Sequence, residues 1–234
     1  MSIDEISKRK GYRSFITLVS NVDTGNLLEV IDSHKQEDII AALKQQPLEV
    51  REQVEEVSVD MWAGFAKVIA EVFPNAQVVF DRFHVMKLVN QALNKIRIQA
   101  QVKIKGSRFL LLKNGTDLTE TEIAQVKQIL AQSPCLKIAY LMKEEFRLIY
   151  ETSTTVKSGM NRFKKWLTGA VSLYGRVART IREHLDGISN YFISRTTSGV
   201  MSGINNKAKL ILRQSYGLKD FQMLRARLLA SFSD

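Results

Sequence analysis

The spacing of apolar residues changes near Asp81, and this change limits what the chain can fold into. Before Asp81, short runs rich in β-branched and aromatic residues alternate with turn residues, which is typical of strands. The predicted strands are 1–6, 14–20 and 27–31. The sequence Asp-Thr-Gly-Asn at 23–26 predicts a turn between the second and the third of them. We therefore expect a three-stranded antiparallel meander.

A strand, a helix and a second strand are expected after the meander. The first strand covers 54–60, the helix 61–73 and the second strand 77–80. A unit of this size is typical of two parallel strands joined by a crossover helix. Another helix is expected over 35–45, with Ser33 as its N-cap. A meander followed by such a unit is the order of the RNase H-like fold.

Beyond Asp81 the pattern predicts helices only. Apolar residues at helical spacing mark one face of 85–96, another of 156–171 and a third of 200–212. Thr119 and Glu122 form a capping box that begins a further helix. Loop signals occur at 113–116 and 133–134, between these helices.

The predicted fold class is α/β, an RNase H-like mixed sheet with a large helical insertion. Residues 1–81 are expected to form the first part of the core and 82–190 a helical, basic insertion. Residues 191–234 are expected to return to the core as helices.

Composition excludes several classes of protein. The single cysteine, Cys135, allows no internal disulfide, and the sequence holds no Cys/His cluster with zinc-ligand spacing. No signal peptide and no apolar run of membrane-spanning length occurs. The sequence therefore predicts a cytoplasmic protein without a membrane partner. A homo-oligomer stays open.

The positive charges are concentrated after the first quarter of the chain. The net charge is +10, yet residues 1–60 hold twelve acids and seven bases. Residues 82–115 carry eight Lys or Arg and no acid, and 152–182 carry seven and no acid. DNA is therefore the expected partner, because neutralising phosphates releases condensed counterions. The expected contacts are Lys87, Lys95, Arg97, Lys164, Lys165, Lys207, Lys209 and Arg213. Solvated helix faces remain the alternative explanation for any single run.

Two acids fall where the predicted topology brings strands together. Asp4 lies in the first strand and Asp60 at the end of the first parallel strand. These strands are neighbours in the predicted sheet, so the two carboxylates would meet at one edge. Paired carboxylates can hold Mg²⁺ or Mn²⁺, and two such ions can drive phosphoryl transfer. Ordinary solvated acids are the alternative that spacing alone leaves open.

Three sequence blocks resemble the DDE transposases of the ISL-three group of bacterial insertion sequences. The first is Ile3-Asp-Glu5 with Lys10-Gly-Tyr12, and the second runs from Val57 to Val85. The third is Thr197-Ser-Gly-Val-Met-Ser-Gly-Ile-Asn-Asn-Lys-Ala-Lys209, with Tyr216-Gly217 and Arg225 beyond it. The blocks occur in order and cover nearly the whole chain.

The resemblance implies a metal-dependent DNA cleavage and strand-transfer site made of Asp, Asp and Glu. Asp4 and Asp60 match the two aspartates, as catalytic residues and metal ligands, and Ser202 stands at the glutamate position. Lys209, seven residues on, supports this register. A serine hydroxyl is short and neutral, so we expect a weakened second metal site and a transposase that is weak or inactive. Glu5 and Asp81 are nearby acids that could substitute.

Further features of the resemblance bear on function. Related transposases are expected to carry a zinc-finger and helix-turn-helix region ahead of the first aspartate, so a truncated copy is predicted. Asp81 and His84 lie at a strand-to-helix junction, where they could cap the helix, support the site or DNA, or bind metal. A non-catalytic DNA-binding remnant and an RNase H-like nuclease are the rival functions. Whether this copy is an enzyme at all is left open.

Overall fold

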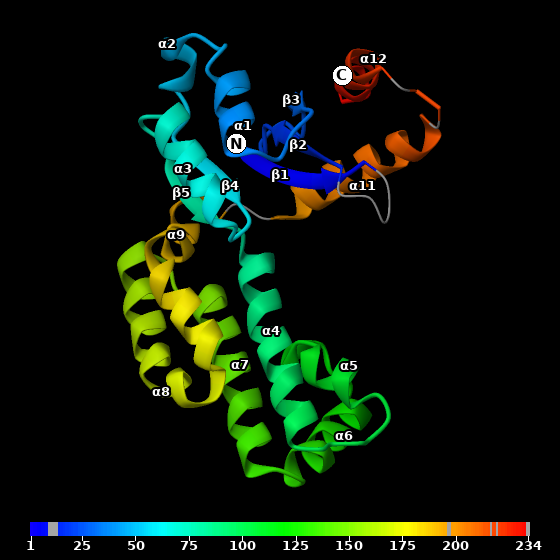
Figure 1. Ribbon diagram of the computed structural model, residues 1–234. Helices are drawn as coiled ribbons and strands as arrows, with labels where there is room; N and C mark the ends of the chain where they lie inside the picture. Colours follow the sequence, from blue (N-terminus) through cyan, green and yellow to red (C-terminus); the bar gives the residue numbers. More distant parts are fainter. Residues whose placement is uncertain (9–13, 196–197, 216, 219, 233–234) are drawn as a thin grey trace. The chain divides into compact units, whose positions relative to one another are not determined.

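The computed structural model describes residues 1–8, 14–195, 198–215, 217–218 and 220–232. It divides into two compact units (Figure 1). The first unit comprises Met1–Arg82 and Arg195–Asp234, and the second comprises Phe83–Ser194. Each unit is described by itself below.

The first unit contains a mixed five-stranded sheet in the order β3-β2-β1-β4-β5. β1 pairs antiparallel with β2 and parallel with β4; β2 and β3 are antiparallel, whereas β4 and β5 are parallel. The strands are β1 (Ser2–Ser7), β2 (Phe15–Ser20), β3 (Leu27–Ile31), β4 (Glu56–Val59) and β5 (Gln77–Phe80). This order confirms the predicted meander, the parallel unit and the RNase H-like fold class.

The turn between β2 and β3 explains their register. The backbone N–H of Asn21 donates to the carbonyl of Asn26 at 2.9 Å across the turn. Gly25 has a φ of +75°, a left-handed conformation that glycine adopts without a steric penalty. The predicted turn at 23–26 is therefore confirmed, with glycine at the residue that needs it.

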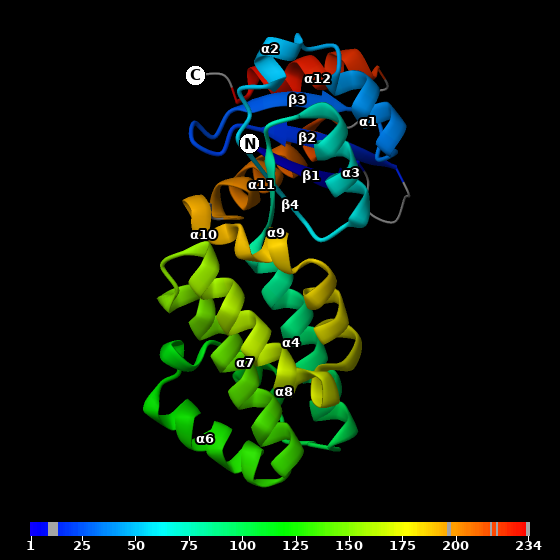
Figure 2. The same ribbon diagram turned by 90° about the vertical axis from the view of Figure 1, so that its left-hand side faces the viewer.

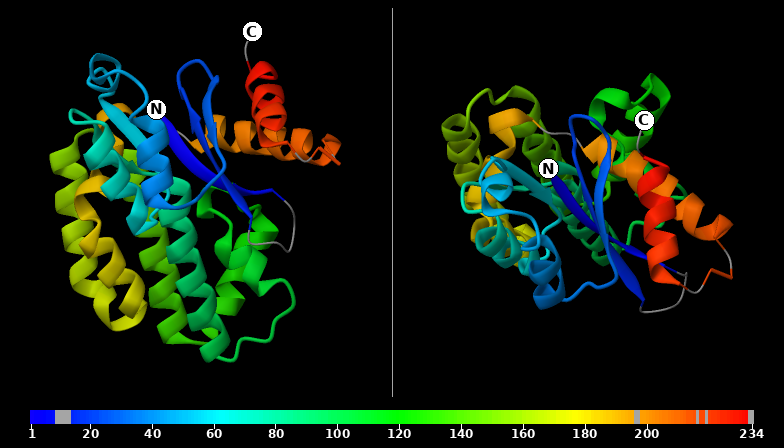
Figure 3. Two further views of the ribbon diagram at one scale, coloured as in Figure 1. Left: turned by 45° about the horizontal axis from the view of Figure 1, so that its top comes forward. Right: turned by 90° about the horizontal axis from the view of Figure 1, so that it is seen from above.

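Helices cover both faces of the sheet. They are α1 (Gln36–Leu43), α2 (Leu48–Arg51), α3 (Ala63–Val72), α11 (Ser198–Gln214) and α12 (Phe221–Ala230). In the right-hand view of Figure 3, the blue and cyan α1 and α3 lie on one side and the orange and red α11 and α12 on the other. The fold is thus a three-layer arrangement in which both sheet faces are buried, as parallel strands require.

The layer between the sheet and α11 forms one hydrophobic cluster. Strand side chains Ile6, Ile16 and Leu18 pack there, and every one of them is at most 2% exposed. From α11 the cluster receives Met201, Ile204, Ala208 and Ile211. These residues recur every three or four positions, so they share one helix face. Alternation along β1 then directs Asp4, two residues before Ile6, to this same side of the sheet.

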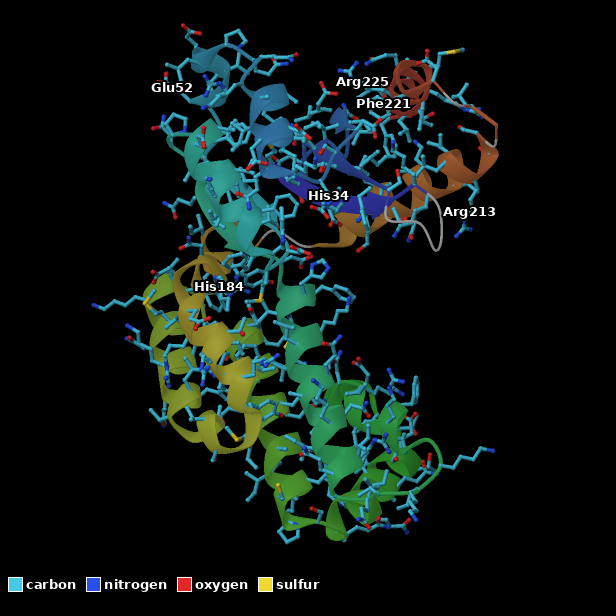
Figure 4. The ribbon with its side chains drawn as sticks, viewed as in Figure 1. His34, Glu52, His184, Arg213, Phe221 and Arg225 are labelled. Carbon is cyan, nitrogen blue, oxygen red and sulfur yellow. The ribbon has the colours of Figure 1, made fainter. Side chains whose placement is uncertain are left out.

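A two-pronged ion pair fastens α12 to the edge strand β3. Arg225 donates from Nε and Nη2 to the two carboxylate oxygens of Glu29, each at 2.6 Å. Arg225 lies on α12 (Figure 4). This arrangement is stronger than a single contact, because the planar guanidinium matches both oxygens at once.

One predicted helix cap is wrong. Ser33 was expected to cap α1, but Lys35 is the N-cap residue, and it makes no side-chain cap bond. Ser33 Oγ instead accepts from the backbone of Lys35 and donates to Asp38 Oδ2 at 2.7 Å. The hydroxyl therefore closes a turn ahead of the helix, since serine bonds nearby backbone in turns as readily as in caps.

The second unit contains helices and no strands in its described residues. Its helices are α4 (Arg82–Gln99), α5 (Ser107–Leu112), the 3-10 turn η1 (Gly115–Asp117), α6 (Glu120–Ala131), α7 (Pro134–Thr152), α8 (Val156–Glu183), α9 (Leu185–Ser189) and α10 (Tyr191–Ser194). The capping box at Thr119 and Glu122 is present and begins α6, as predicted. The backbone of α8 departs from helical geometry at Gly175, which has a φ of +41°.

The loop signal at Ser133 and Pro134 marks the break between α6 and α7, as predicted, but the pattern did not predict α7 itself. Ser133 Oγ accepts from the backbone of Leu136, and Pro134 occupies the first turn of α7. Proline is favoured there because its missing N–H would have no helical partner anyway. α7 runs alongside α8 (Figure 2).

An aromatic cluster fills the core between α7 and α8. Trp166 packs against Phe146 with ring centroids 4.7 Å apart, and its indole nitrogen donates to the carbonyl of Met142 at 2.8 Å. Phe146, Phe163 and Tyr150 are fully buried around it.

Within the described residues no helix is long and apolar enough to cross a bilayer.

Candidate functional site

The parallel pairing of β1 and β4 brings Asp4 and Asp60 to adjacent positions. Ser2 pairs with Ser58 and Ile3 with Val59, and the next residues in this register are the two aspartates. Neighbouring strands lie about 5 Å apart, and paired residues point to the same face. Asp60 directly follows β4, so the two carboxylates meet where that strand ends.

Backbone amides orient both carboxylates. Asp4 Oδ1 accepts from the backbone N–H of Glu5 at 2.8 Å. Asp60 Oδ1 accepts from the backbone N–H of Trp62, also at 2.8 Å, in the turn that leads into α3. Both aspartates are half-buried. These two bonds fix one oxygen of each carboxylate.

The second oxygen of Asp4 is met by a residue from α11. Asn205 Nδ2 donates to Asp4 Oδ2 at 2.5 Å. Asn205 follows Ile204, which is buried against the sheet, and this position aims the amide at β1. Asn205 belongs to the third sequence block, where its residue type alone indicates no role. Its position beside the buried stripe of α11 is the signal that could have found it.

Ser202 lies on the same flank of α11, one turn before Asn205, and it is exposed. The predicted glutamate position is therefore on the helix that contacts Asp4, and the residue there is short and neutral. Lys209 continues this flank, one turn after Asn205, and is exposed.

Glu5 adds a third acidic group. Burial, followed by the charges of Asp60 and Asp4, raises the pKa of Glu5 to about 7. Its Oε1 is buried and has no hydrogen-bond partner among the described residues. The largest charge effect on Glu5 comes from Asp60, which places these carboxylates within electrostatic reach of one another.

These groups suit a hard divalent cation. Carboxylate and amide oxygens are the ligands that Mg²⁺ prefers, and Asp4, Asp60 and Asn205 offer them together. Nowhere in the described ranges do three or more His, Cys, Asp or Glu side chains converge well enough to hold a metal. The candidate site has two such side chains, Asp4 and Asp60, and its third oxygen comes from the amide of Asn205.

The predicted support residues lie in different units. Asp81 directly follows β5, and its backbone N–H donates to the carbonyl of Val59 at 2.9 Å. This bond joins the ends of β4 and β5. His84, in the first turn of α4, belongs to the second unit, where its ring meets that of Phe83 edge-on. The function of this pair stays a prediction.

The predicted DNA contacts differ in their surroundings. Lys207, Lys209 and Arg213 are exposed on α11, and Figure 4 shows Arg213 toward the end of that helix. Lys207 Nζ lies 4.5 Å from the ring centroid of Phe232. In the second unit, Lys164 and Lys165 are exposed on α8.

α4 and α5 enclose a basic groove in the second unit, with a volume of about 630 Å³. Lys87 and Lys95 line it, together with Arg108, which the sequence analysis did not select. Phe83 and Ile98 add apolar surface and are 57% and 58% exposed.

Arg97 is placed differently from these lysines. Its guanidinium donates to Asn94 Oδ1 at 3.0 Å and to the carbonyl of Val102 at 3.1 Å. Arg97 therefore ties α4 to the segment that leads into α5.

Comparison with known proteins identifies the family. A family model described as transposase, that of the ISL-three group of DDE transposases, matches residues 1–228. The chain belongs to the ISL-three group of transposases. The transposase for insertion sequence element IS1001 of Bordetella parapertussis is 23% identical over 246 residues, which cover 99% of this chain. That for element IS1557 of Mycobacterium tuberculosis is 26% identical over 261 residues, which cover 97% of this chain.

The ISL-three chain described here spans 60% and 58% of the length of these two relatives. A protein named ATP-dependent protease, from Lactococcus lactis subsp. lactis, is 28% identical over 120 residues, half of this chain. The family membership rests on the match over nearly the whole chain. It confirms the resemblance that the three sequence blocks carried.

Proposed function

We propose that the first unit catalyses metal-dependent DNA cleavage and strand transfer, the chemistry of insertion-sequence transposition. The observation that carries this proposal is the register of β1 and β4, which sets Asp4 beside Asp60. Membership of the transposase family gives the class of reaction. DNA is accordingly the proposed substrate.

Asp4 and Asp60 are the proposed ligands of Mg²⁺ or Mn²⁺. When bound, such ions would activate a water or a 3′ hydroxyl and stabilise the leaving oxygen in phosphoryl transfer. The protein itself supports cation binding at this point. The carboxylates of Asp4 and Asp60 lie side by side there, and their charges, after burial, help to raise the pKa of the neighbouring Glu5. A cation would relieve this concentration of negative charge.

We further propose that activity is reduced in this chain because Ser202 stands at the glutamate position. A hydroxyl can neither reach as far as a carboxylate nor offset the charge of a second cation. The loss of such a ligand costs on the order of several kcal/mol in transition-state stabilisation. We expect rates lower by several orders of magnitude than with glutamate at this position.

The basic side chains are the proposed DNA contacts. Lys207, Lys209 and Arg213 lie on α11, the helix that also contacts Asp4. Lys87, Lys95 and Arg108 line the groove of the second unit, where apolar surface lies beside the charges. Such a groove suits a phosphate backbone whose bases contact aromatic or aliphatic side chains.

A second candidate is a DNA-binding protein without catalysis. Ser202 favours it, because the exposed hydroxyl adds no charge to the site. This protein would bind DNA with steep salt dependence and would leave it uncut even with Mn²⁺.

Nicking of labelled DNA in Mg²⁺ and Mn²⁺ tests the proposal. The chain is compared with Ser202→Glu, and Asp60→Ala is the blank for each. Cutting that is strong in Ser202→Glu and weak in the natural chain supports both the site and the reduced activity. If Ser202→Glu binds DNA yet does not cut it, the catalytic proposal is wrong for this chain. Equal cutting by both proteins would refute the reduced activity alone.

A further inference from the structure

Asn205 is a residue of α11 that contacts Asp4. Its Nδ2 donates to Asp4 Oδ2, and its Oδ1 is buried without a hydrogen-bond partner in the described part of the chain. A buried polar oxygen that lacks a partner costs about 1–3 kcal/mol, and native proteins rarely retain one without a reason. We therefore expect this oxygen to bind a hydrogen-bond donor or a cation that is not part of the protein chain.

A divalent cation would satisfy this oxygen. Amide carbonyls are good ligands for hard cations. The oxygen and nitrogen of an asparagine amide are assigned from the hydrogen bonds around them, because their shapes are nearly the same. Here the nitrogen faces Asp4 Oδ2, and the oxygen of the same amide is the buried atom without a partner among the described residues. A cation held beside Asp4 would be met by this oxygen while the nitrogen keeps its hydrogen bond to the carboxylate.

We propose that Asn205 Oδ1 is the third protein ligand of the cation that Asp4 and Asp60 hold. It provides, from α11, an oxygen ligand of the kind that the resemblance to DDE transposases implies at position 202. The ligand is neutral, so it supports binding of one cation but contributes no charge toward a second. This inference rests on the proposed metal site at the two aspartates.

The alternatives from the same region fit less well. Ser202 is exposed and lies one turn away from the residue that contacts Asp4. Glu5 follows Asp4 in β1 and pairs with Thr17, so the alternation of the strand directs it to the other face of the sheet.

Terbium luminescence tests the proposal without any need for activity. Tb³⁺ is added to the complete chain, and its decay in H₂O and in D₂O gives the number of waters on the ion. Asn206 provides the matched control, because it is the same residue type, next along α11, and exposed. The variants are Asn205→Ala and Asn206→Ala, with Asp60→Ala to define site-bound ion.

We expect Asn205→Ala to raise the number of coordinated waters by about one, because a water replaces the lost oxygen ligand. Asn206→Ala should leave the number unchanged. A residue that only positions Asp4 would alter affinity but not this number. An unchanged water count in Asn205→Ala, with binding still dependent on Asp60, overturns the assignment of Asn205 alone. Binding that does not depend on Asp60 overturns the proposed metal site itself.

Asn205→Asp decides the matter if the alanine variant does not fold. A carboxylate at a ligand position should tighten Tb³⁺ binding by about tenfold or more, whereas Asn206→Asp should change it by less than about threefold. Equal effects of the two aspartates would overturn the proposal, because they would show only a general gain of negative charge.

Discussion

Glu5→Gln should prevent the loss of folding stability that the first unit undergoes as the pH rises. The pKa of the Glu5 carboxyl rises from 4.5 to about 7 because the group is buried and stands near Asp60 and Asp4. The folded state therefore holds this proton more tightly than the unfolded chain does. The stability that this gives is fully present below about pH 4.5 and is lost as the pH rises through about 7.

The size of the effect follows from the shift. One pKa unit corresponds to about 1.4 kcal/mol, so the full shift would amount to about 3 kcal/mol. Glu5 is only half-buried, and solvent screening reduces this to about 1–2 kcal/mol. Glutamine cannot ionise and keeps nearly the same shape. The variant should therefore gain about 1–2 kcal/mol over the natural chain between pH 4 and pH 8.

Hydrogen exchange of peptides from β1 and β2 measures this difference in the first unit alone. Both proteins are compared at each pH in the presence of EDTA, so the intrinsic exchange rate cancels and divalent cations are absent. Glu52→Gln is the control, since Glu52 is exposed on the surface (Figure 4). A difference between Glu5→Gln and the natural chain that stays constant from pH 4 to pH 8 would refute the reasoning.

Three further predictions concern packing, an ion pair and DNA. Gly159→Ala should lower the free energy of unfolding of the second unit by about 1–3 kcal/mol in thermal or urea denaturation, because the added Cβ would lie 1.9 Å from the Phe192 ring. Gly169→Ala, whose Cβ would meet only Met142 at 3.6 Å, should not lower it. Arg225→Lys should cost about 1 kcal/mol and speed hydrogen exchange in α12, because an ammonium cannot contact both Glu29 oxygens in the same way; unchanged exchange would contradict this. Lys87→Ala with Lys95→Ala should reduce the slope of log affinity against log salt by about two, whereas Lys127→Ala, outside the groove, should leave it unchanged if the groove binds DNA.

The strands could be predicted because their signals are local. Turn residues bound each one, and Gly25 supplies the left-handed conformation that the β2–β3 turn needs. Local signals were less reliable where one residue type serves two purposes. Ser33 closes a turn instead of capping α1, and Pro134, which follows the predicted break, also begins the unpredicted helix α7. Serine and proline are common in turns and at helix starts, so only the chain that follows decides between the two.

The site could be predicted only in part. Asp4 and Asp60 follow from topology, because parallel neighbours bring their ends to one edge of the sheet. Asn205 could not be found this way. Its contact with Asp4 joins residues far apart in the chain, and it depends on how α11 rotates about its axis. That rotation is set by the burial of Met201, Ile204 and Ala208, whose fit against the strands is a tertiary property.

The buried face of α11 holds the fold together, whereas the position proposed for catalysis, Ser202, lies on its exposed face. The buried stripe of this helix holds it against β1 and β2, whereas Ser202 is exposed and adds nothing to that packing. A change at position 202 should therefore alter stability by less than about 0.5 kcal/mol, as is usual for surface positions. A change there leaves the scaffold intact, so the aspartates, Asn205 and the basic residues keep their places. For the same reason Ser202→Glu adds a charge without rebuilding the core, and its activity reports on chemistry alone.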